Sequence, residues 1–218
     1  MSNDLSLPVA LYLVATPVGN LSDISQRAIE VLAKVTLIAA EDTRRTGVLL
    51  ERLGIKGQMM AYHDHNEEKQ IPVLLDKLEQ GSSVALVSDA GTPVINDPGY
   101  KLVRSAQEKG FQVIPIPGAC SPIIALSASG LPTDRFIYEG FLPAKQKARL
   151  NALQELVDES RTLIFLESCH RIEATLTDCA TVFGGDREGV IAREMTKTYE
   201  TIRRAKLADL VDWLAQDS

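Results

Sequence analysis

Blocks of apolar residues along this chain predict short strands separated by helices. Each apolar run is followed by a turn-forming stretch and then by a segment with helical periodicity. In the first half we expect strands over residues 9–15, 36–40, 58–62, 84–88 and 111–116. We expect helices between them that end near Val35, Leu53, Gly81 and Lys109. Strands that alternate with helices in this way indicate a mostly parallel sheet wrapped by helices.

Capping signals predict where three of these helices begin or end. Asp23 and Gln26 have the spacing of a capping box ahead of the first helix. Asp97 and Pro98 provide an N-cap residue and a first-turn proline for the helix that ends near Lys109. Gly54 stands at the expected end of the second helix, where a left-handed residue is common.

The pattern changes after "SASGLPTD", and a second α/β segment follows. Strands are expected over residues 135–141, 162–167, 189–193 and 199–204. A charged amphipathic helix in "AKQKARLNALQELVDES", a helix over residues 170–183 and a final helix from Leu207 separate or follow them. The chain is therefore expected to be an α/β protein with two domains, a mostly parallel sheet in residues 1–120 and a mixed sheet in residues 121–218.

Composition and charge narrow the possible functions. The chain has 218 residues, of which 45% are hydrophobic and 24% charged, as is usual for a soluble globular protein. Its net charge of -6 argues against bulk binding of polyanions, so any contact with nucleic acid must use local basic patches. The three cysteines are odd in number and lack metal-ligand spacing, which predicts reduced thiols, no metal and a cytoplasmic location. The apolar run near the start is too short for a signal peptide or a membrane span.

Four loops follow the predicted strands and are rich in glycine, proline and small polar residues. They read "TPVGN", "EDTRR", "SDAGTPVINDPG" and "PGACSP". In an open parallel sheet, ligands bind outside the carboxyl ends of the strands, where such loops converge. The chain lacks both a G-x-G-x-x-G after a strand and a G-x-x-x-x-G-K-[ST] motif, which disfavours a dinucleotide oxidoreductase or an ordinary nucleotide hydrolase. The residues by themselves therefore predict an adenosine-like ligand in a crevice, without identifying that ligand.

Seven motifs occur in order along nearly the whole chain. They are "ATPVGNLSDISQRA", "AAEDTRRTG", "YHDHNEE", "ALVSDAGTPVINDPGY", "ALSASGLPTDRF", "EGFLP" and "AREMTKTYE". Together they resemble the ribosomal RNA small-subunit methyltransferase I group, within the tetrapyrrole-methylase superfamily of class III methyltransferases. The resemblance implies a tetrapyrrole-methylase-like fold of two α/β domains, with S-adenosylmethionine in a cofactor cleft between them. It also implies a homodimer that methylates the ribose 2'-hydroxyl of a decoding-centre cytidine in 16S ribosomal RNA, in the small ribosomal subunit.

The same resemblance implies cofactor contacts from both domains. The first loop reads T-P-V-G-N where the superfamily commonly has G-x-G-P-G. Pro17, in this loop, is expected to form the floor of the cofactor pocket. The remaining expected cofactor contacts are Ser88, Asp89, Ala90, Gly91, Pro117, Cys120, Ser121, Glu167, Ala192, Met195 and Thr196.

A ribose hydroxyl is a weak nucleophile, so transfer of a methyl group to it calls for a base or a cationic neighbour. The candidates are Asp42, His63, His65, Glu194 and Lys197. Asp42 together with Lys197 is the preferred pair, and a solvated ion pair is the alternative for Glu194 and Lys197.

Basic residues at three places are candidates for contact with RNA phosphates. Arg44 and Arg45 follow a strand end, and His63 lies in the "YHDHNEE" loop. The other two clusters are Lys145, Lys147 and Arg149, and Arg203, Arg204 and Lys206. A charge run is more often only a solvated face, so Arg44, inside a motif of the group, is the strongest of these candidates.

Two other functions remain open at this point. A sister enzyme that methylates tetrapyrrole carbons would share the fold and the cofactor. A non-catalytic RNA-binding or cofactor-sensing protein would retain the fold without turnover. Members of the group continue beyond the position that corresponds to "DLVDWLAQDS", so we also expect the second domain to lack part of its sheet.

Overall fold

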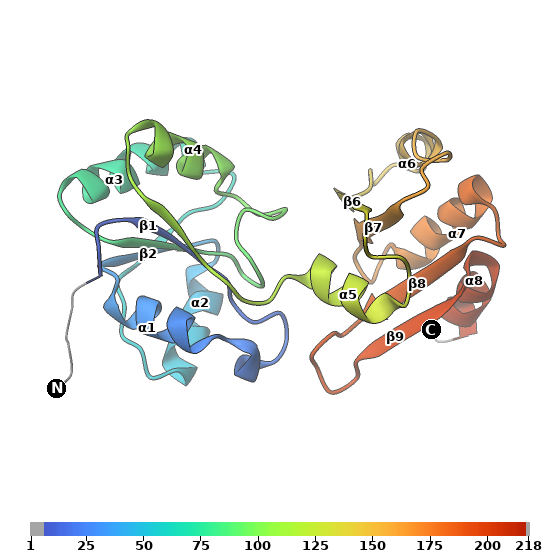
Figure 1. Ribbon diagram of the computed structural model, residues 1–218, viewed down its shortest axis with the longest axis horizontal. Coiled ribbons are helices and arrows are strands. Elements are labelled where there is room, and N and C mark those ends of the chain that lie inside the picture. The colour runs from blue at the N-terminus through green and yellow to red at the C-terminus, as the bar shows by residue number, and fades with distance from the viewer. Residues whose placement is uncertain (1–6, 217–218) are drawn as a thin grey trace. The chain divides into compact units, whose positions relative to one another are not determined.

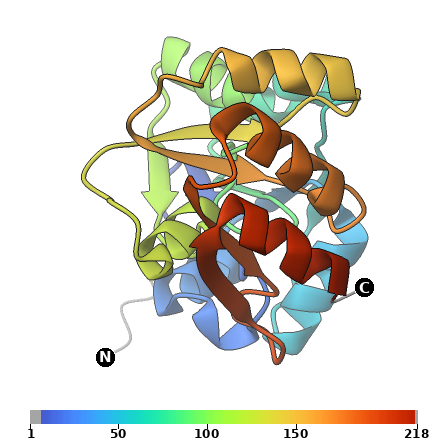
Figure 2. The ribbon, with the colours of Figure 1, turned by 90° about the vertical axis from the view of Figure 1, so that its right-hand side faces the viewer.

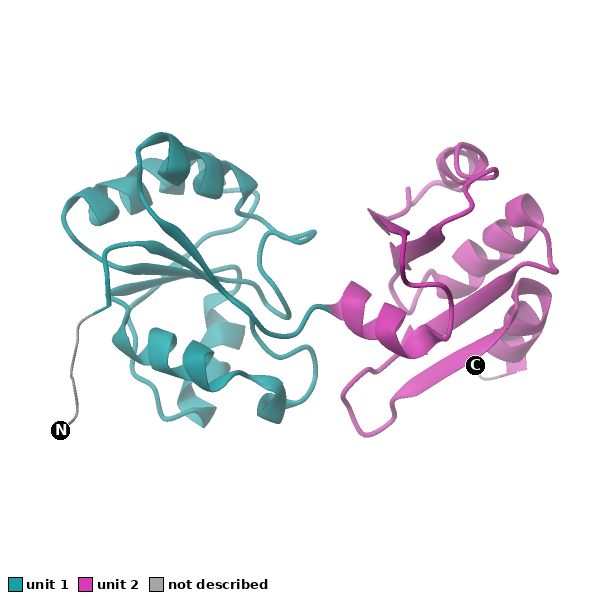
Figure 3. Ribbon diagram, viewed as in Figure 1, with its two compact units in different colours: residues 1–120 teal, residues 121–218 magenta. Residues whose placement is uncertain are grey.

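The computed structural model describes residues 7–216 and forms two compact units, with the division between Cys120 and Ser121 (Figures 1 and 3). Each unit has its own sheet structure and hydrophobic core. No helix of this described part is long and apolar enough to cross a membrane.

The first unit contains a five-stranded sheet in the order β3-β2-β4-β1-β5. Every neighbouring pair in it is parallel. Its strands are β1 (Leu11–Val14), β2 (Leu37–Ala40), β3 (Met59–Ala61), β4 (Val84–Val87) and β5 (Val113–Ile116). The predicted mostly parallel sheet is thus confirmed, with each observed strand shorter than the predicted apolar run.

Helices cover both faces of this sheet (Figure 1). On one face, α1 (Gln26–Lys34) and α2 (Thr43–Arg52) share a core with alternate residues of the strands, Tyr12 among them. On the other face, α3 (Glu67–Glu79) and α4 (Tyr100–Glu108) pack on the intervening residues. Side chains of a strand alternate between the two faces of a sheet. Because helices cover both faces here, all four residues of the apolar strand β4 are buried.

The connections place a topological switch point between β2 and β4. All five strands are parallel, so their carboxyl ends lie at one edge of the sheet. The chain leaves β2 through α2 toward β3 on one face, and leaves β4 through α4 toward β5 on the opposite face. Adjacent strands whose connections depart in opposite directions form a topological switch point, where open α/β sheets bind ligands.

Two of the predicted helix starts are wrong. The N-cap of α1 is Ser25, whose hydroxyl accepts a hydrogen bond from the amide of Ala28 at 3.1 Å, because a short 3-10 turn occupies the residues before it. The helix α4 has Gly99 at its N-cap, with φ 134° and no side-chain cap. Asp97 does not cap α4, since its carboxyl group is hydrogen-bonded to Ser88 at the end of β4. The predicted helix end at Gly54, with φ 68°, is confirmed.

The strands of the second unit form two separate two-stranded sheets in the described part of the chain, where the sequence predicted one mixed sheet. One pair, β6 (Phe136–Phe141) with β7 (Thr162–Leu166), is parallel. The other, β8 (Glu188–Arg193) with β9 (Thr201–Lys206), is antiparallel. The helices are α5 (Ser121–Ser129), α6 (Gln146–Gln154), α7 (Ile172–Phe183) and α8 (Leu207–Gln216). Figure 2 shows α8 against the β8–β9 hairpin.

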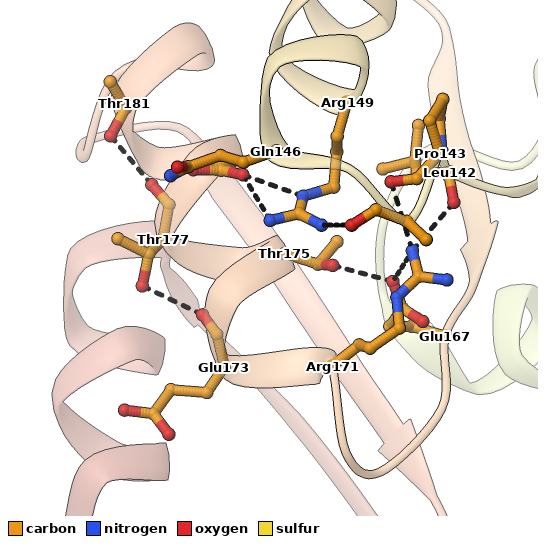
Figure 4. A network of polar contacts seen from close by, with 12 residues as sticks. Leu142, Pro143, Gln146, Arg149, Glu167, Arg171, Glu173, Thr175, Thr177 and Thr181 are labelled. Carbon is orange, nitrogen blue, oxygen red and sulfur yellow. Dashed lines mark hydrogen bonds and ion pairs between the residues drawn. The ribbon is translucent and has the colours of Figure 1, made fainter.

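A buried ion pair joins α6 and α7 in this unit (Figure 4). The Arg149 guanidinium lies 2.7 Å from the Asp178 carboxylate, and their side chains are only 5% and 4% exposed. Gln146 donates a second hydrogen bond to Asp178, and Arg149 also donates to the carbonyl of Ala144. The prediction that Arg149 belongs to an RNA-facing basic cluster is therefore wrong, because the helix turns this residue into its own core.

Candidate functional site

Hydrogen bonds fasten three loops at the carboxyl edge of the first sheet. Thr16, after β1, exchanges backbone hydrogen bonds with Gly91, after β4, at N–O distances of 2.8 and 3.0 Å. The Thr16 hydroxyl donates to the carbonyl of Ser88 at 3.3 Å. The Thr92 hydroxyl donates to the carbonyl of Ala119, after β5, at 2.9 Å. The loops after β1, β4 and β5 therefore form one connected rim.

The backbone of the loop after β4 is held in conformations that few side chains allow. Gly91 has φ 87°, and Val94 and Asn96 have φ 75° and 67°. A left-handed conformation is rare for a β-branched residue such as valine, and strained residues of this kind gather at functional sites. At Gly118, in the loop after β5, a Cβ atom would come within 2.8 Å of the Cβ of Ala15, so close packing of the rim requires glycine there.

A second set of hydrogen bonds joins the loops after β2 and β4 at the switch point. The amide of Asp89 donates to the Glu41 carboxylate at 3.1 Å, and the amide of Asp42 donates to the Asp89 carboxylate at 3.1 Å. The Arg45 guanidinium lies 3.3 Å from the other oxygen of Asp89. The switch point thus holds carboxylates from two strand ends and an arginine that is mostly exposed.

Two carboxyl groups at this edge have opposite pKa shifts. Asp42 is the N-cap of α2, and its carboxylate accepts from the side chain and the amide of Arg44. These hydrogen bonds hold the pKa of Asp42 well below its usual range. Burial raises the pKa of Asp97 to about 6, and the nearby carboxylates of Glu41, Asp89 and Asp64 add to the shift. Asp42 therefore stays ionised, while Asp97 is poised to exchange a proton near neutral pH.

The loop after β3 brings His63 to the same edge. Its amide donates to the Asn66 side chain at 2.9 Å, which fixes the start of the turn before α3. Its Nδ1 atom is buried and has no hydrogen-bond partner among the residues that the structure describes. His65 packs edge-on, with 6.0 Å between the ring centroids. A buried nitrogen without a partner is costly, and a bound polar group would satisfy it.

The predicted cofactor residue Glu167 is fully engaged within the second unit (Figure 4). Its side chain is 4% exposed. Its oxygens accept from the Thr175 hydroxyl at 2.7 Å, the Arg171 guanidinium at 3.0 Å and the amide of Ser168 at 2.8 Å. In this structure Glu167 thus organises the segment that leads into α7.

The predicted catalytic residues Glu194 and Lys197 lie together in the turn between β8 and β9. Their side chains form an ion pair of 2.9 Å and are 50% and 45% exposed. Glu194 and Thr196 both have positive φ, 51° and 65°, and the amide of Thr196 donates to the Glu200 carboxylate at 2.6 Å. The lysine and the glutamate thus form an ion pair that solvent reaches.

The structure separates the predicted site residues into two groups. The loops at the carboxyl edge of the first sheet contain Pro17, the stretch 88–91 and Pro117. At the same edge Asp42 caps α2, and the arginine pair lies in the first turn of that helix. Cys120 ends this unit. The second unit holds Ser121, Lys145, Glu167, Ala192, Glu194, Met195, Thr196 and Lys197. Sequence reasoning missed the bracing residues Thr16, Glu41 and Thr92, although each lies inside a quoted motif, because a single threonine or glutamate in a loop gives no signal of its partner.

Two solved structures have a fold similar to that of this chain. The chain is similar to a cobalamin biosynthetic enzyme, cobalt precorrin-4 methyltransferase, with a TM-score of 0.69 and 17% identity over 96% of this chain and 90% of that one. It is also similar to uroporphyrin-III C-methyltransferase from Thermus thermophilus in complex with S-adenosyl homocysteine, with a TM-score of 0.63 and 18% identity over 94% and 91% of the two chains. At such identities the likeness shows the fold alone.

The chain belongs to the tetrapyrrole (corrin/porphyrin) methylase family, whose sequence profile matches residues 10–211. It is 58% identical over 207 residues to the ribosomal RNA small subunit methyltransferase I of Escherichia coli O157:H7, which is 95% of this chain and 72% of that protein. It is 57% identical to the protein of the same name from Haemophilus influenzae, over 95% of this chain and 73% of that protein. The family resemblance in the sequence motifs is thus confirmed.

Proposed function

We propose that this protein is an S-adenosylmethionine-dependent methyltransferase that modifies ribosomal RNA of the small subunit. The single observation that carries the proposal is the identity of 58% over 95% of the chain with a relative named for that activity. The finer assignment is methylation of a cytidine 2'-hydroxyl in 16S ribosomal RNA, as the motifs of the group imply. The protein would act in the cytoplasm, as a homodimer, on the small ribosomal subunit.

The carboxyl edge of the first sheet fits the proposed cofactor. S-adenosylmethionine carries an adenine, two ribose hydroxyls, an amino group and a sulfonium whose methyl carbon it supplies to the acceptor. The braced rim offers carboxylates at Asp89 and Asp97 for hydroxyl and ammonium groups, and an unpartnered imidazole nitrogen at His63. The hydrogen bonds between Thr16, Ser88 and Gly91 hold this rim in place before a ligand arrives, and such preorganisation strengthens binding.

Exposed arginines beside this edge support an RNA substrate. The side chains of Arg44 and Arg45 are 89% and 69% exposed. Each lies close to a carboxylate, which holds it at the rim while leaving other N–H donors available for a phosphate. This pair of arginines provides local positive charge for an RNA phosphate, although the net charge of the chain is -6.

We propose that a side chain of this protein accepts the proton of the ribose hydroxyl. We retain Lys197, oriented by Glu194, as a candidate, because their ion pair keeps the lysine in place. Lys197 must first release its own proton to solvent, and the neutral amine then accepts the proton of the ribose hydroxyl. Asp42 is better suited to fixing Arg44 than to accepting a proton, since its lowered pKa makes it a weak base.

A second candidate function is methylation of a tetrapyrrole carbon, which the family description and the names of the structural neighbours favour. Those neighbours are at most 18% identical to this chain, whereas the relatives named for ribosomal RNA reach 58%. A protein that binds RNA or cofactor without turnover is the third candidate. The greater identity favours the RNA substrate.

Methyl transfer from labelled S-adenosylmethionine tests the three candidates together. We expect label in the small-subunit RNA of ribosomes from cells that lack the gene, and none in uroporphyrinogen III. Label only in the porphyrin would establish the second candidate, and cofactor binding without label in either substrate would establish the third. Arg44→Ala should reduce transfer to RNA at least tenfold with unchanged cofactor affinity, whereas Arg104→Ala, which removes an exposed arginine on α4, should leave both unchanged. Light scattering measures the proposed dimer.

A further inference from the structure

The turn between β8 and β9 carries an aromatic side chain that the described residues leave almost uncovered. Tyr199 is 82% exposed, the largest exposed fraction among the large apolar side chains that the structure describes. Single exposed apolar residues are common on protein surfaces, so this exposure alone does not indicate a site. The surroundings of Tyr199 decide what its ring can bind.

Tyr199 lines a pocket formed by the β8–β9 turn and the segment that precedes α7. The cavity has a volume of about 740 Å³, within the range of roughly 300–1,000 Å³ typical of small-ligand sites. None of the residues expected to contact the cofactor lines it, whereas Glu194 of the predicted catalytic pair does. We call this cavity the Tyr199 pocket. Its other lining residues are Cys169, Arg193, Glu194, Thr198, Glu200 and Thr201.

Hydrogen bonds hold the backbone on both sides of Tyr199. The amide of Lys197 donates to the carbonyl of Glu194 at 3.0 Å, and the amide of Glu200 donates to the carbonyl of Lys197 at 3.2 Å. The Thr201 hydroxyl donates to the carbonyl of Tyr199 itself at 3.3 Å. The backbone that carries the ring is thus ordered before a ligand arrives, which lowers the entropy cost of binding.

A second aromatic residue fixes the cation of this pocket. The guanidinium carbon of Arg193 lies 4.9 Å from the centroid of the Trp213 ring on α8, and the guanidinium carbon of Arg203 lies equally close to the same ring. A cation over an aromatic face is attracted to the ring, so Trp213 restricts where the Arg193 guanidinium lies. Because arginine donors match phosphate oxygens, the Tyr199 pocket combines an aromatic face with an anchored group that binds phosphate.

This combination fits a nucleotide. An aromatic face stacks on an unpaired nucleobase of RNA, and an arginine binds the neighbouring phosphate. The carboxylates of Glu194 and Glu200 are acceptors for an exocyclic amino group, such as that of cytosine. A tetrapyrrole that carries several carboxylates fits less well, because two glutamates and one arginine line the pocket.

We propose that the Tyr199 pocket holds an unstacked nucleobase of the RNA substrate, with the ring of Tyr199 stacked on the base and Arg193 bound to an adjacent phosphate. This inference rests on the proposed function, because it takes RNA as the acceptor. Glu194, which lines the pocket, forms an ion pair of 2.9 Å with Lys197. A nucleotide bound in the pocket therefore brings a ribose beside the candidate base.

Affinity for protein-free 16S RNA and for small ribosomal subunits, both from cells that lack the gene, tests the stacking. We expect Tyr199→Ala to weaken binding to each by about fivefold or more, the effect of losing one base–aromatic stack. Tyr199→Phe and Tyr199→Trp keep a ring and should retain the affinity. Tyr199→Leu keeps apolar bulk without a ring and should bind as weakly as Tyr199→Ala.

Two controls accompany these variants. Phe136→Ala removes another exposed aromatic side chain, one that does not line the pocket, and should leave RNA affinity unchanged. Affinity for S-adenosyl homocysteine should be the same in all variants, because Tyr199 is not among the expected cofactor contacts. Trp213 fluorescence establishes that each variant is folded.

Alkylation of Cys169 tests where the RNA binds. Cys169 is an exposed free thiol that lines the pocket, whereas the Cys179 thiol is buried. Saturating RNA should slow the reaction of Cys169 with iodoacetamide by about fivefold or more, because a bound nucleotide blocks access to the sulfur. Cys179 is the internal reference and should react slowly with or without RNA. Peptide mass spectrometry separates the two cysteines.

Several results would overturn the proposal. Unchanged RNA affinity in Tyr199→Ala, or no measurable RNA affinity in the unsubstituted protein, would each do so. An equal loss in Tyr199→Phe would assign the effect to the hydroxyl group. Weaker binding to subunits alone would make Tyr199 a contact for a ribosomal protein. RNA that binds without protecting Cys169 would place the base elsewhere.

Failure of the proposed function gives a different result. The unsubstituted protein would then transfer no label from S-adenosylmethionine to small-subunit RNA. The stacking is decided by affinity and by protection of Cys169, whether or not transfer occurs.

Discussion

The two units of this protein bury the residues of their strands to very different extents. In the first unit, all four residues of both β2 and β4 are buried, and each of these strands has a neighbour on either side. In the second unit, β7 and β8 each bury one residue, and each has a neighbour on one side only among the described residues. The comparison teaches that the number of paired neighbours, more than the apolar content of a strand, decides whether the strand is buried.

The units also differ in where they keep their charges. The first unit places Glu41, Asp42 and Asp89 in loops at the edge of its sheet, where a ligand has access to them. The second unit encloses the Arg149–Asp178 pair between helices, in which position it is part of the core. Charges in the first unit are thus available for binding, while those of the second fix how its helices pack.

The largest expected effect comes from breaking the enclosed ion pair. Asp178→Ala leaves the Arg149 guanidinium buried without its partner, which should cost about 3–5 kcal/mol in the free energy of unfolding of the second unit. Trp213 is the only tryptophan and lies in this unit, so its fluorescence during denaturant unfolding measures the loss. Asp186→Ala, which removes the exposed pair with Lys206, is the matched control and should leave the free energy of unfolding nearly unchanged. Equal losses in the two variants would show that the buried pair has no special weight.

A smaller effect is expected from crowding the core of the first unit. At Gly99 a Cβ atom would lie 2.6 Å from Cδ2 of Leu86, so Gly99→Ala should destabilise this unit by about 1–3 kcal/mol beyond the backbone strain. Gly81→Ala provides the comparison, because Gly81 also has a positive φ but open space around it. Hydrogen exchange of the β4 amides reports the difference. A variant at Gly99 no less stable than the variant at Gly81 would contradict the packing of Leu86 against α4.

The smallest expected effect depends on pH and concerns Asp97, at the charged edge of the first unit's sheet. Because burial raises the pKa of Asp97 to about 6, the folded state binds its proton more tightly than the unfolded state does. The contribution of Asp97 to stability is therefore fully present below about pH 4, the range of an unperturbed aspartate, and is lost as the pH rises through about 6.

Asp97→Asn should consequently stabilise the protein by about 1–2 kcal/mol at pH 8 and by much less at pH 4, after allowance for the partial exposure of the carboxyl group. Thermal unfolding across this pH range measures the difference. Asp186→Asn provides the control. Lys206 lowers the pKa of the exposed Asp186 carboxylate, so this variant should not stabilise the protein at pH 8. A gain for Asp97→Asn that is the same at pH 4 and pH 8 would rule out the raised pKa as its cause.

Most of the secondary structure was predictable from local pattern, and the exceptions have physical causes. The alternation of strands and helices and the helix end at Gly54 depend on residues close in sequence. The capping predictions for Asp23 and Asp97 failed because a 3-10 turn and a hydrogen bond to Ser88 compete for these residues. Arg149 was assigned to the surface because nothing in its own helix reveals Asp178, which is 29 residues away in the chain.

The parallel first sheet, the loops at its carboxyl edge and, through the motifs, the family could all be inferred from the amino-acid sequence alone. Local hydrophobic periodicity and short motifs are properties of neighbouring residues, so they can be recognised without coordinates. Only the tertiary structure decided that Glu41 and Asp89 join the loops after β2 and β4, that Glu167 is engaged in its own unit, and that Cys169 and Tyr199 line one pocket. These features depend on contacts between residues far apart in the chain, and such contacts exist only once the strands and helices have packed.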